Sequence, residues 1–186
     1  MRKNFGAKTV LYPMPVLIIG TYDENGTPNA MNAAWGGISE ENEITVCVSD
    51  DHKTAKNLAV RGAFTVSMAD VPNVVAADFV GIVSGNDVPD KLQRAGWHAT
   101  KSDFVDAPLF DELPVALECT VLSYDADTCR LVGRIENLTA DERVLDARGR
   151  IDLSHFSPVV YDPVGHGYYR LGDKVGQAFS DGKKLK

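Results

Sequence analysis

The sequence predicts a mainly β protein with short helices, built as a closed or partly closed antiparallel barrel with the helices over its ends. Six or more segments have the composition and patterning of strands, and most connections between them are of the hairpin type. The strict alternation of strand and helix that a doubly wound sheet needs is absent. The 186 residues suffice for one domain with a substantial core, and no repeat, low-complexity tract or linker divides them.

An apolar run and a turn signal predict the first strands. Residues 15–22 have the pattern of a buried strand, and the pair Asn25-Gly26 is a strong hairpin signal because both residues tolerate positive φ. The chain resumes at residues 29–38, where β-branched residues are scarce and Ala and Gly are frequent. We expect that composition in a strand against which something flat lies closely.

An alternating segment and a helix follow. Residues 43–49 alternate at period two, which places three apolar side chains on one face: Ile44, Val46 and Val48. The stretch from Asp50 or Asp51 to Gly62 has helix punctuation, with an acidic cap at its start and a glycine at its close. Its apolar face is expected at Ala55, Leu58 and Ala59. Residues 63–69 predict another strand.

The second half is predicted to hold two short helices and a long hairpin. Proline suits a first helical turn, so one helix is expected to begin near Pro72 and another to run from Pro89 to Ala95. Segments 115–124 and 129–137 flank a polar turn and predict the hairpin. Further short extended pieces are expected near 143–146 and 158–161. Glycines beyond them predict irregular chain: Gly165, Gly167, Gly172 and Gly176.

The three cysteines, Cys47, Cys119 and Cys129, fit no metal-ligand spacing. Matching the apolar faces of the predicted hairpin places Cys119 opposite Gly133, so that Cys129 lies four residues further along the strand. That separation is about 13 Å at the rise of a strand. A disulfide needs Cα atoms within about 7 Å, so we expect reduced, structural cysteines.

Charge and hydropathy disfavour several classes of protein. The formal net charge of −7 argues against a nucleic-acid or anionic-membrane binder, which needs clustered lysine and arginine. The one dense basic run, Lys183, Lys184 and Lys186, is interpreted as a solvated tail. No apolar run reaches the about 20 residues that span a bilayer. Pro13 and Pro15 interrupt the apolar stretch near the start, so we expect no signal peptide and a cytoplasmic protein.

The first candidate site is residues 49–57, where a strand is followed by a helix. Free N–H groups and the positive dipole end at a helix N-terminus attract a phosphate. Hydroxyl and cationic side chains lie in this segment: Ser49, His52, Lys53 and Thr54. The alternative is a capped surface helix with scattered lysines, and Asp50 and Asp51 count against a phosphate unless they point away.

The second candidate site is residues 29–37, in which amide side chains alternate with small residues. Asn29 and Asn32 offer both donors and acceptors, and Trp35 offers a flat apolar face. This combination suits a heteroaromatic ring whose edge is read by hydrogen bonds. The alternative is a tightly packed inner strand in which the backbone satisfies Asn32.

Other chemistry finds little support in the sequence. The four histidines show no metal-ligand spacing: His52, His98, His155 and His166. There is no Gly-x-Ser-x-Gly elbow, no Gly-x-Gly-x-x-Gly and no Walker-type loop. We therefore expect no metal site, and hydrolase and classical dinucleotide-fold functions are disfavoured.

The order of these segments resembles the flavin reductase-like family, and within it the flavoredoxin-type subgroup. The resemblance is carried by Pro15-Val-Leu-Ile-Ile-Gly-Thr21, Asn29-Ala-Met-Asn-Ala-Ala-Trp35, Ser49 with His52-Lys-Thr-Ala-Lys-Asn57, and Phe64-Thr-Val-Ser-Met68. Three later stretches also match that subgroup: Phe79-Val-Gly-Ile-Val-Ser-Gly85, Asp90-Lys91 and His166-Gly-Tyr-Tyr-Arg-Leu-Gly172. Together they cover nearly the whole chain.

The resemblance implies a single FMN-binding domain over residues 1–186, with the fold of a split β-barrel, a Greek-key antiparallel barrel with peripheral helices. The residues implied to line the isoalloxazine and ribityl part of FMN are Asn29, Met31, Asn32 and Trp35. Those implied to surround the ribityl chain and phosphate are Ser49, His52, Lys53, Thr54 and Asn57. Lys91 is implied to approach the flavin, and Tyr168 to close the pocket.

The resemblance also implies a homodimer with FMN near the subunit interface. The implied function is an oxidoreductase that holds FMN, is reduced by NADH or NADPH and passes electrons to a free flavin or a protein acceptor. Hydride passes directly from a stacked nicotinamide to the flavin, so no general base is required and no catalytic residue is predicted. Two alternatives stay open: an FMN-binding electron carrier without a nucleotide site, and a cofactor-free scaffold protein.

Overall fold

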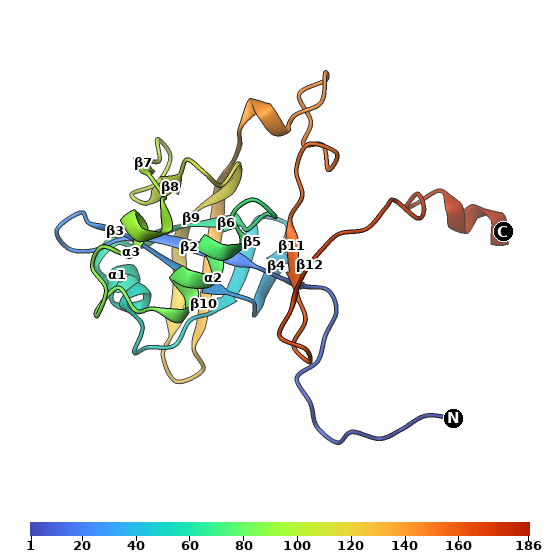
Figure 1. The fold of residues 1–186 in the computed structure, drawn as a ribbon, viewed down its shortest axis with the longest axis horizontal. Helices are drawn as coiled ribbons and strands as arrows, with labels where there is room; N and C mark the ends of the chain where they lie inside the picture. Colours follow the sequence, from blue (N-terminus) through green and yellow to red (C-terminus); the bar gives the residue numbers. More distant parts are fainter.

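A seven-stranded antiparallel sheet forms the body of the protein (Figure 1). The computed structural model describes all residues from 1 to 186. In spatial order the sheet contains β3 (Pro28–Ala33), β2 (Leu17–Tyr22), β6 (Ala63–Met68), β9 (Val115–Asp125), β10 (Arg130–Ala140), β5 (Glu43–Cys47) and β4 (Gly36–Glu40). The sheet curls into a half-barrel, which confirms the predicted mainly β split-barrel fold.

Two smaller sheets complete the β structure. One contains β1 (Met14–Pro15), β11 (Val159–Tyr161) and β12 (Tyr168–Arg170), and the other pairs β7 (Ala99–Lys101) with β8 (Pro108–Phe110). The prediction of irregular chain was wrong for β12, because a strand of three residues is too short to show a period. The extended piece expected near 143–146 was also wrong: Glu142–Val144 is a 3-10 helix, and only Leu145 forms a β-bridge, with Ile151.

Three α-helices lie beside the sheet: α1 (Lys53–Arg61), α2 (Val74–Ile82) and α3 (Lys91–Ala95). A further 3-10 helix, Asp181–Leu185, lies near the C-terminus. The close of α1 at Gly62 is confirmed, with φ at 63°. The acidic cap was wrong, since His52 occupies the N-cap position and no side chain caps the helix. Ala59 is exposed, and the buried face of α1 carries Thr54, Ala55, Asn57 and Leu58.

The core has two main parts, one on each face of β2. Ile19 belongs to the part that fills the half-barrel under α1, with Phe64 and Leu131. Ile18 belongs to the part beneath α2, with Val80 and Phe110. Successive side chains of a strand point to opposite faces, so β2 is buried on both. The position of α2 beside β3 follows from this second part of the core.

The long hairpin of β9 and β10 forms as predicted, but with a different register. Cys119 lies opposite Ile135 and not Gly133. The pairing begins at the turn with Arg130 opposite Asp125, and an irregularity between Val132 and Gly133 then shifts it by one residue. A Cβ atom on Gly133 would lie 2.2 Å from Cζ of Phe64, so the strand needs glycine at this point. The three cysteines are free, and burial raises the pKa of the Cys119 thiol to about 12.

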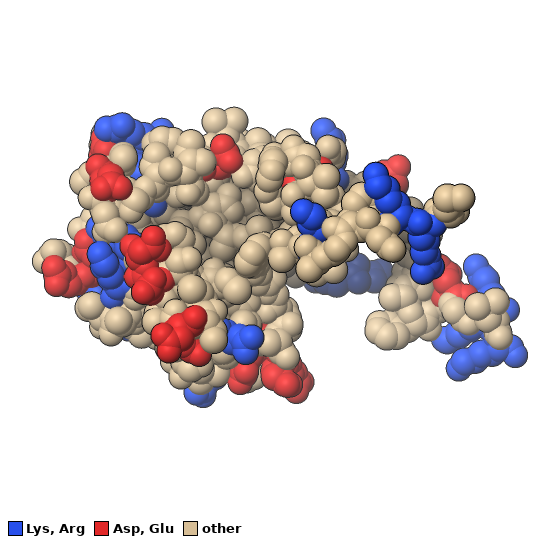
Figure 2. Space-filling view, turned by 90° about the horizontal axis from the view of Figure 1, so that it is seen from below, with Lys and Arg blue, Asp and Glu red and all other residues tan.

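The two ends of the chain leave the body as extended arms (Figure 1). Residues 1–13, the N-terminal arm, and 171–186, the C-terminal arm, are exposed throughout. The three lysines near the C-terminus are exposed, as expected of a solvated tail. Figure 2 shows basic side chains, with a few acidic ones, on the side of the molecule from which both arms extend, while both signs of charge mix on the body. None of the helices is long and apolar enough to cross a bilayer.

Candidate functional site

Two pockets lie next to each other at the last turn of α2 and are together called the cleft. One has a volume of about 340 Å³ and is called here the tyrosine end; its lining includes Asn32, Asp78, Tyr161, His166 and Tyr168. The other has a volume of about 400 Å³ and is called the α1 end; its lining includes Asp51, His52, Lys53 and residues 83–87. Gly81 and Ile82 line both pockets, so the cleft runs along the end of α2.

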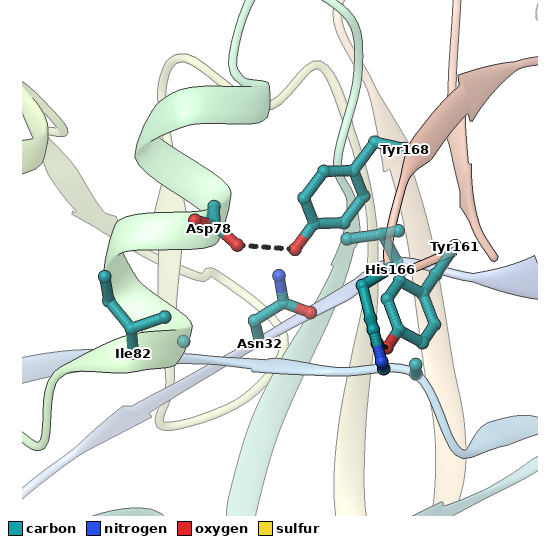
Figure 3. A pocket seen from close by; sticks show the side chains of 9 residues that line it. Asn32, Asp78, Ile82, Tyr161, His166 and Tyr168 are labelled. Atoms are coloured by element: carbon teal, nitrogen blue, oxygen red, sulfur yellow. Dashed lines mark hydrogen bonds between the residues drawn. The ribbon is translucent and has the colours of Figure 1, made fainter. Parts of the chain in front are cut away.

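Aromatic and hydrogen-bonding side chains surround the tyrosine end (Figure 3). Tyr168 donates from its hydroxyl to Oδ1 of Asp78 at 2.7 Å, and the Tyr161 hydroxyl lies 2.7 Å from Nδ1 of His166. Burial, and then the bond to Asp78, raises the pKa of Tyr168 to about 12. The phenol is therefore a neutral donor at physiological pH. The hairpin of β11 and β12 brings Tyr161, His166 and Tyr168 to this wall.

Asn32 joins β3 to α2 at the tyrosine end. Its Nδ2 donates to the carbonyl oxygen of Ala77 at 3.0 Å, and its amide faces the pocket beside Asp78 and Tyr168 (Figure 3). A Cβ atom on Gly81 would lie 2.8 Å from Cβ of Asn32, so glycine allows the helix to approach the strand this closely. The carbonyl oxygen of Ala77 thus accepts from the amide group of Asn32, and the Asn32 side chain also lines the pocket.

Unpaired backbone N–H groups converge on the α1 end. The amides of Lys53 and Thr54, in the first turn of α1, have no hydrogen-bond acceptor. The amides of Ser84 and Gly85, in the loop after α2, have no acceptor either. Lys53, Ser84 and Gly85 line the pocket. Such groups, together with the positive end of the helix dipole, form a site for an anion.

The charge of Lys53 already has a partner. Its Nζ lies 3.1 Å from Oδ2 of Asp23, and the two side chains are 20% and 16% exposed. Burial raises the pKa of the Asp23 carboxyl, but hydrogen bonds from the Thr27 amide and from Lys53 outweigh burial and leave that pKa below its ordinary value. Asp51 also lines the pocket, 3.8 Å from Nε2 of His52, whereas Asp50 does not line it.

Asn29 contributes a buried, unpaired acceptor. The residue is 3% exposed, and its Nδ2 donates to Oγ1 of Thr54 at 3.2 Å. Its Oδ1 has no hydrogen-bond partner, and a Cβ atom on Gly85 would lie 2.4 Å from it. A buried acceptor without a donor costs about 1–3 kcal/mol. Asn29 lines neither end of the cleft, but its Oδ1 lies next to Gly85, which lines the α1 end.

Several residues implied by the resemblance lie outside the lining of the cleft. Asn57 is buried and donates to Oγ1 of Thr21 at 2.9 Å, which ties α1 to β2. Ser49 is exposed in the loop before α1 and lines neither end. Met31 packs against the barrel core, on the face of β3 opposite to Asn32. The roles of these residues toward FMN stay predictions.

Lys91 and Trp35 also lie away from the cleft. Lys91 is 4% exposed and donates to the carbonyl oxygens of Val80 at 3.3 Å and Val83 at 3.2 Å, so it caps the end of α2. Trp35 is 55% exposed and lines a separate pocket with β4 and part of the N-terminal arm. Their roles toward FMN likewise stay predictions.

Sequence reasoning overlooked most of the lining of the cleft, including Asp78, Gly81, Ser84, Gly85, Tyr161 and His166. One signal was available. Gly81, Ser84 and Gly85 are small residues at the end of an apolar helix, and such residues allow a close approach of the backbone. They belong to the stretch 79–85, which entered the prediction only as part of the resemblance. No spacing connects Tyr161 or His166 with Asp78, because different elements carry them.

Comparisons with known proteins agree with this fold. A family model described as "Flavin reductase like domain" matches residues 9–166. The flavoredoxin of Desulfovibrio vulgaris (Miyazaki F) matches with a TM-score of 0.93 and 36% identity, over 98% of this chain and 100% of that one. A flavoredoxin from Methanosarcina acetivorans matches with a TM-score of 0.89 and 26% identity, over 100% of both chains.

A curated relative is also similar in sequence, though over a shorter stretch. It is an uncharacterized protein of Aeropyrum pernix, 29% identical over 111 residues, which are 59% of this chain. The match spans 42% of the length of that relative.

Proposed function

Because this chain belongs to the family of the flavin reductase like domain, we propose that it binds FMN and works as an oxidoreductase. In this proposal electrons pass from NADH or NADPH through FMN to a free flavin or a protein acceptor. The observation that carries the proposal is the cleft with two chemically different ends. The α1 end offers N–H groups to an anion, and the tyrosine end offers aromatic walls and hydrogen-bonding groups to a ring.

The α1 end fits a phosphate. The unpaired amides of Lys53, Thr54, Ser84 and Gly85 would hold its oxygen atoms. The Thr54 hydroxyl accepts from Asn29 and so keeps its own proton free to donate. Gly85 has no side chain in the way, which lets the backbone come close to the ligand.

The unpaired oxygen of Asn29 supports a role for this residue toward the ribityl chain. A phosphate at neutral pH offers mainly acceptors, whereas Oδ1 of Asn29 needs a donor. The hydroxyl groups of a ribityl chain supply that donor. Asn29 would thus hold the sugar part on the side of the phosphate, next to α1.

The tyrosine end would hold the ring beside Asn32, Asp78 and Tyr168. Bound FMN supplies the redox chemistry, since it takes up a hydride from a nicotinamide and passes the electrons on. The protein contributes position and electrostatics. The Tyr168 phenol stays neutral because its pKa is raised to about 12, and the Asp78 carboxylate is held by the hydrogen bond from that phenol.

We also propose that the protein is a homodimer and that the partner chain completes the site. The support is apolar surface on the C-terminal arm that the chain itself leaves uncovered: Val175 is 101%, Phe179 98% and Leu185 94% exposed. Burying such side chains is worth about 1.5–3 kcal/mol each. Light scattering of the full chain tests this proposal, because a monomer at micromolar concentration would contradict it.

Absorption spectroscopy tests the proposed function. The protein is mixed with FMN, freed of unbound flavin and then given NADH or NADPH without oxygen. We expect a bound flavin spectrum that either nucleotide bleaches. Binding without bleaching by either nucleotide would instead favour an electron carrier that lacks a nucleotide site. A protein that retains no flavin would refute the proposal.

A double variant tests the phosphate assignment separately. Replacing Lys53 and Thr54 together by alanine should weaken FMN far more than riboflavin, which has no phosphate. Equal losses for the two flavins would contradict a phosphate at the start of α1.

A further inference from the structure

Lys53 is the only lysine or arginine that lines the α1 end, and its ammonium group is turned toward the turn between β2 and β3. There it lies 3.1 Å from Oδ2 of Asp23, in a pair of which both side chains are at least four-fifths buried. A charge pair at this separation and with this little solvent is a substantial interaction, unlike an exposed surface pair. A phosphate that binds the ammonium of Lys53 therefore has to compete with the carboxylate of Asp23.

Asp23 is fixed without the help of Lys53. Its Oδ1 accepts from the amides of Asn25 at 3.0 Å and Thr27 at 2.9 Å, which close the turn. Arg61, the last residue of α1, donates from Nε and from a terminal nitrogen to the Asp23 carbonyl oxygen, at 2.9 and 2.7 Å. The carboxylate is therefore a rigid acceptor, and only its Oδ2 faces the lysine.

The stem of Lys53 lies beside the loop after α2. A Cβ atom on Gly85 would lie 3.1 Å from Cδ of Lys53, so the aliphatic chain packs against the loop whose unpaired amides, those of Ser84 and Gly85, belong to residues that line the pocket. The end of a lysine side chain turns about several single bonds. Rotation about those bonds can carry the ammonium from Asp23 toward the pocket.

We propose that Asp23 is an internal counter-ion that competes with the phosphate for Lys53, and that it thereby sets how strongly the site prefers FMN over riboflavin. The inference rests on the proposed function, since it assumes that a flavin phosphate occupies the α1 end. Asp23 touches neither ligand, and it acts through Lys53. Removing its charge leaves the phosphate as the only anionic partner for the ammonium.

The test is Asp23→Asn, with Kd measured for FMN and for riboflavin by flavin fluorescence. Asparagine keeps an Oδ1 that accepts from the turn amides, so the turn is preserved. We expect the Kd for FMN to fall by about tenfold, which corresponds to about 1.4 kcal/mol, and the Kd for riboflavin to stay unchanged. Should this variant not fold, Asp23→Ser offers the turn a hydroxyl acceptor and carries the same expectation.

Two controls separate this effect from others. Asp106, in the loop between β7 and β8, pairs with Arg61 at the far end of α1, at 3.2 Å, so Asp106→Asn removes the same negative charge from beside the same helix. It should leave the ratio of the two Kd values unchanged. In a Lys53→Met background, Asp23→Asn should also leave the ratio unchanged, because the residue through which it acts is gone.

Each other result overturns the inference. A weaker FMN complex in Asp23→Asn, with riboflavin unaffected, would mean that Asp23 holds Lys53 in its binding position. An equal gain in Asp106→Asn would mean a general effect of net charge. If both flavins bind the natural protein and the ratio does not respond to Asp23→Asn, this inference fails alone. If neither flavin binds the natural protein, the proposed function fails.

Discussion

Lys91 is expected to make the stability of the protein increase with pH. It is 4% exposed, and burial, with a smaller effect from the charge of Lys53, lowers its pKa from 10.5 to about 8. The unfolded chain keeps this proton up to about pH 10.5, whereas the folded chain releases it near pH 8. Between these values the unfolded chain binds more protons, so the free energy of unfolding rises with pH.

The size of the increase follows from the same shift. The linkage relation gives an increase in the free energy of unfolding of at most about 2 kcal/mol between pH 7 and pH 9.5. The carbonyl oxygens of Val80 and Val83, which accept from Nζ, favour the charged amine and reduce the gain. We therefore expect about 1–2 kcal/mol.

Urea unfolding of the natural protein and of Lys91→Met, over this pH range, measures the effect. Methionine keeps an unbranched apolar chain and has no group that titrates. Every other titrating group is common to both proteins, so the difference between the two curves isolates Lys91. The natural protein should gain stability relative to the variant as the pH rises. Parallel curves, or a relative loss, would refute this account of the buried amine.

Two further predictions concern the cleft and its surroundings. Gly85→Ala places a methyl group 2.4 Å from Oδ1 of the buried Asn29 and should weaken FMN binding by about tenfold or more, since overpacking costs about 1–3 kcal/mol. Gly172→Ala, where nothing lies within 4 Å, is the matched control, and equal affinities of the two variants would contradict the assignment. If Trp35 packs near the ring, FMN should strongly quench its fluorescence in a Trp97→Phe background, and an unchanged signal would count against that placement.

The parts of the fold that could be predicted are those whose signals are local. The buried strand of residues 15–22 and the Asn25-Gly26 turn need only an apolar run and a dipeptide, and both are present in the structure as β2 and its turn into β3. Gly62 ends α1 for a similarly local reason. By contrast, β7 and β12 have three residues each, and their pairing depends on partners elsewhere in the fold. The pairing that sets Cys119 opposite Ile135, with its irregularity between Val132 and Gly133, leaves no pattern in the sequence.

The candidate site shows the same division. The approach of α1 to β3 was predicted, and the bond between Asn29 and Thr54 confirms that the two segments are adjacent. The alternation of side chains along the strand was overlooked. Asn29 and Asn32 are three residues apart, so their side chains leave β3 on opposite faces. Asn29 therefore reaches α1, while Asn32 reaches α2. Tyr168 joins Asn32 only because a distant hairpin folds back over α2, which no local pattern indicates.

The same geometry explains how so acidic a chain can offer a site for an anion. The net charge is −7, the one lysine of the α1 end is paired with Asp23, and Asp51 and Asp87 line the same pocket. An anion held there cannot depend on an excess of cations. Backbone N–H groups carry no net charge, yet they are fixed donors directed by the helix and the loop. Recognition of the phosphate would then come mainly from the backbone N–H groups, and the ammonium of Lys53 would add to it only as far as the phosphate competes with Asp23.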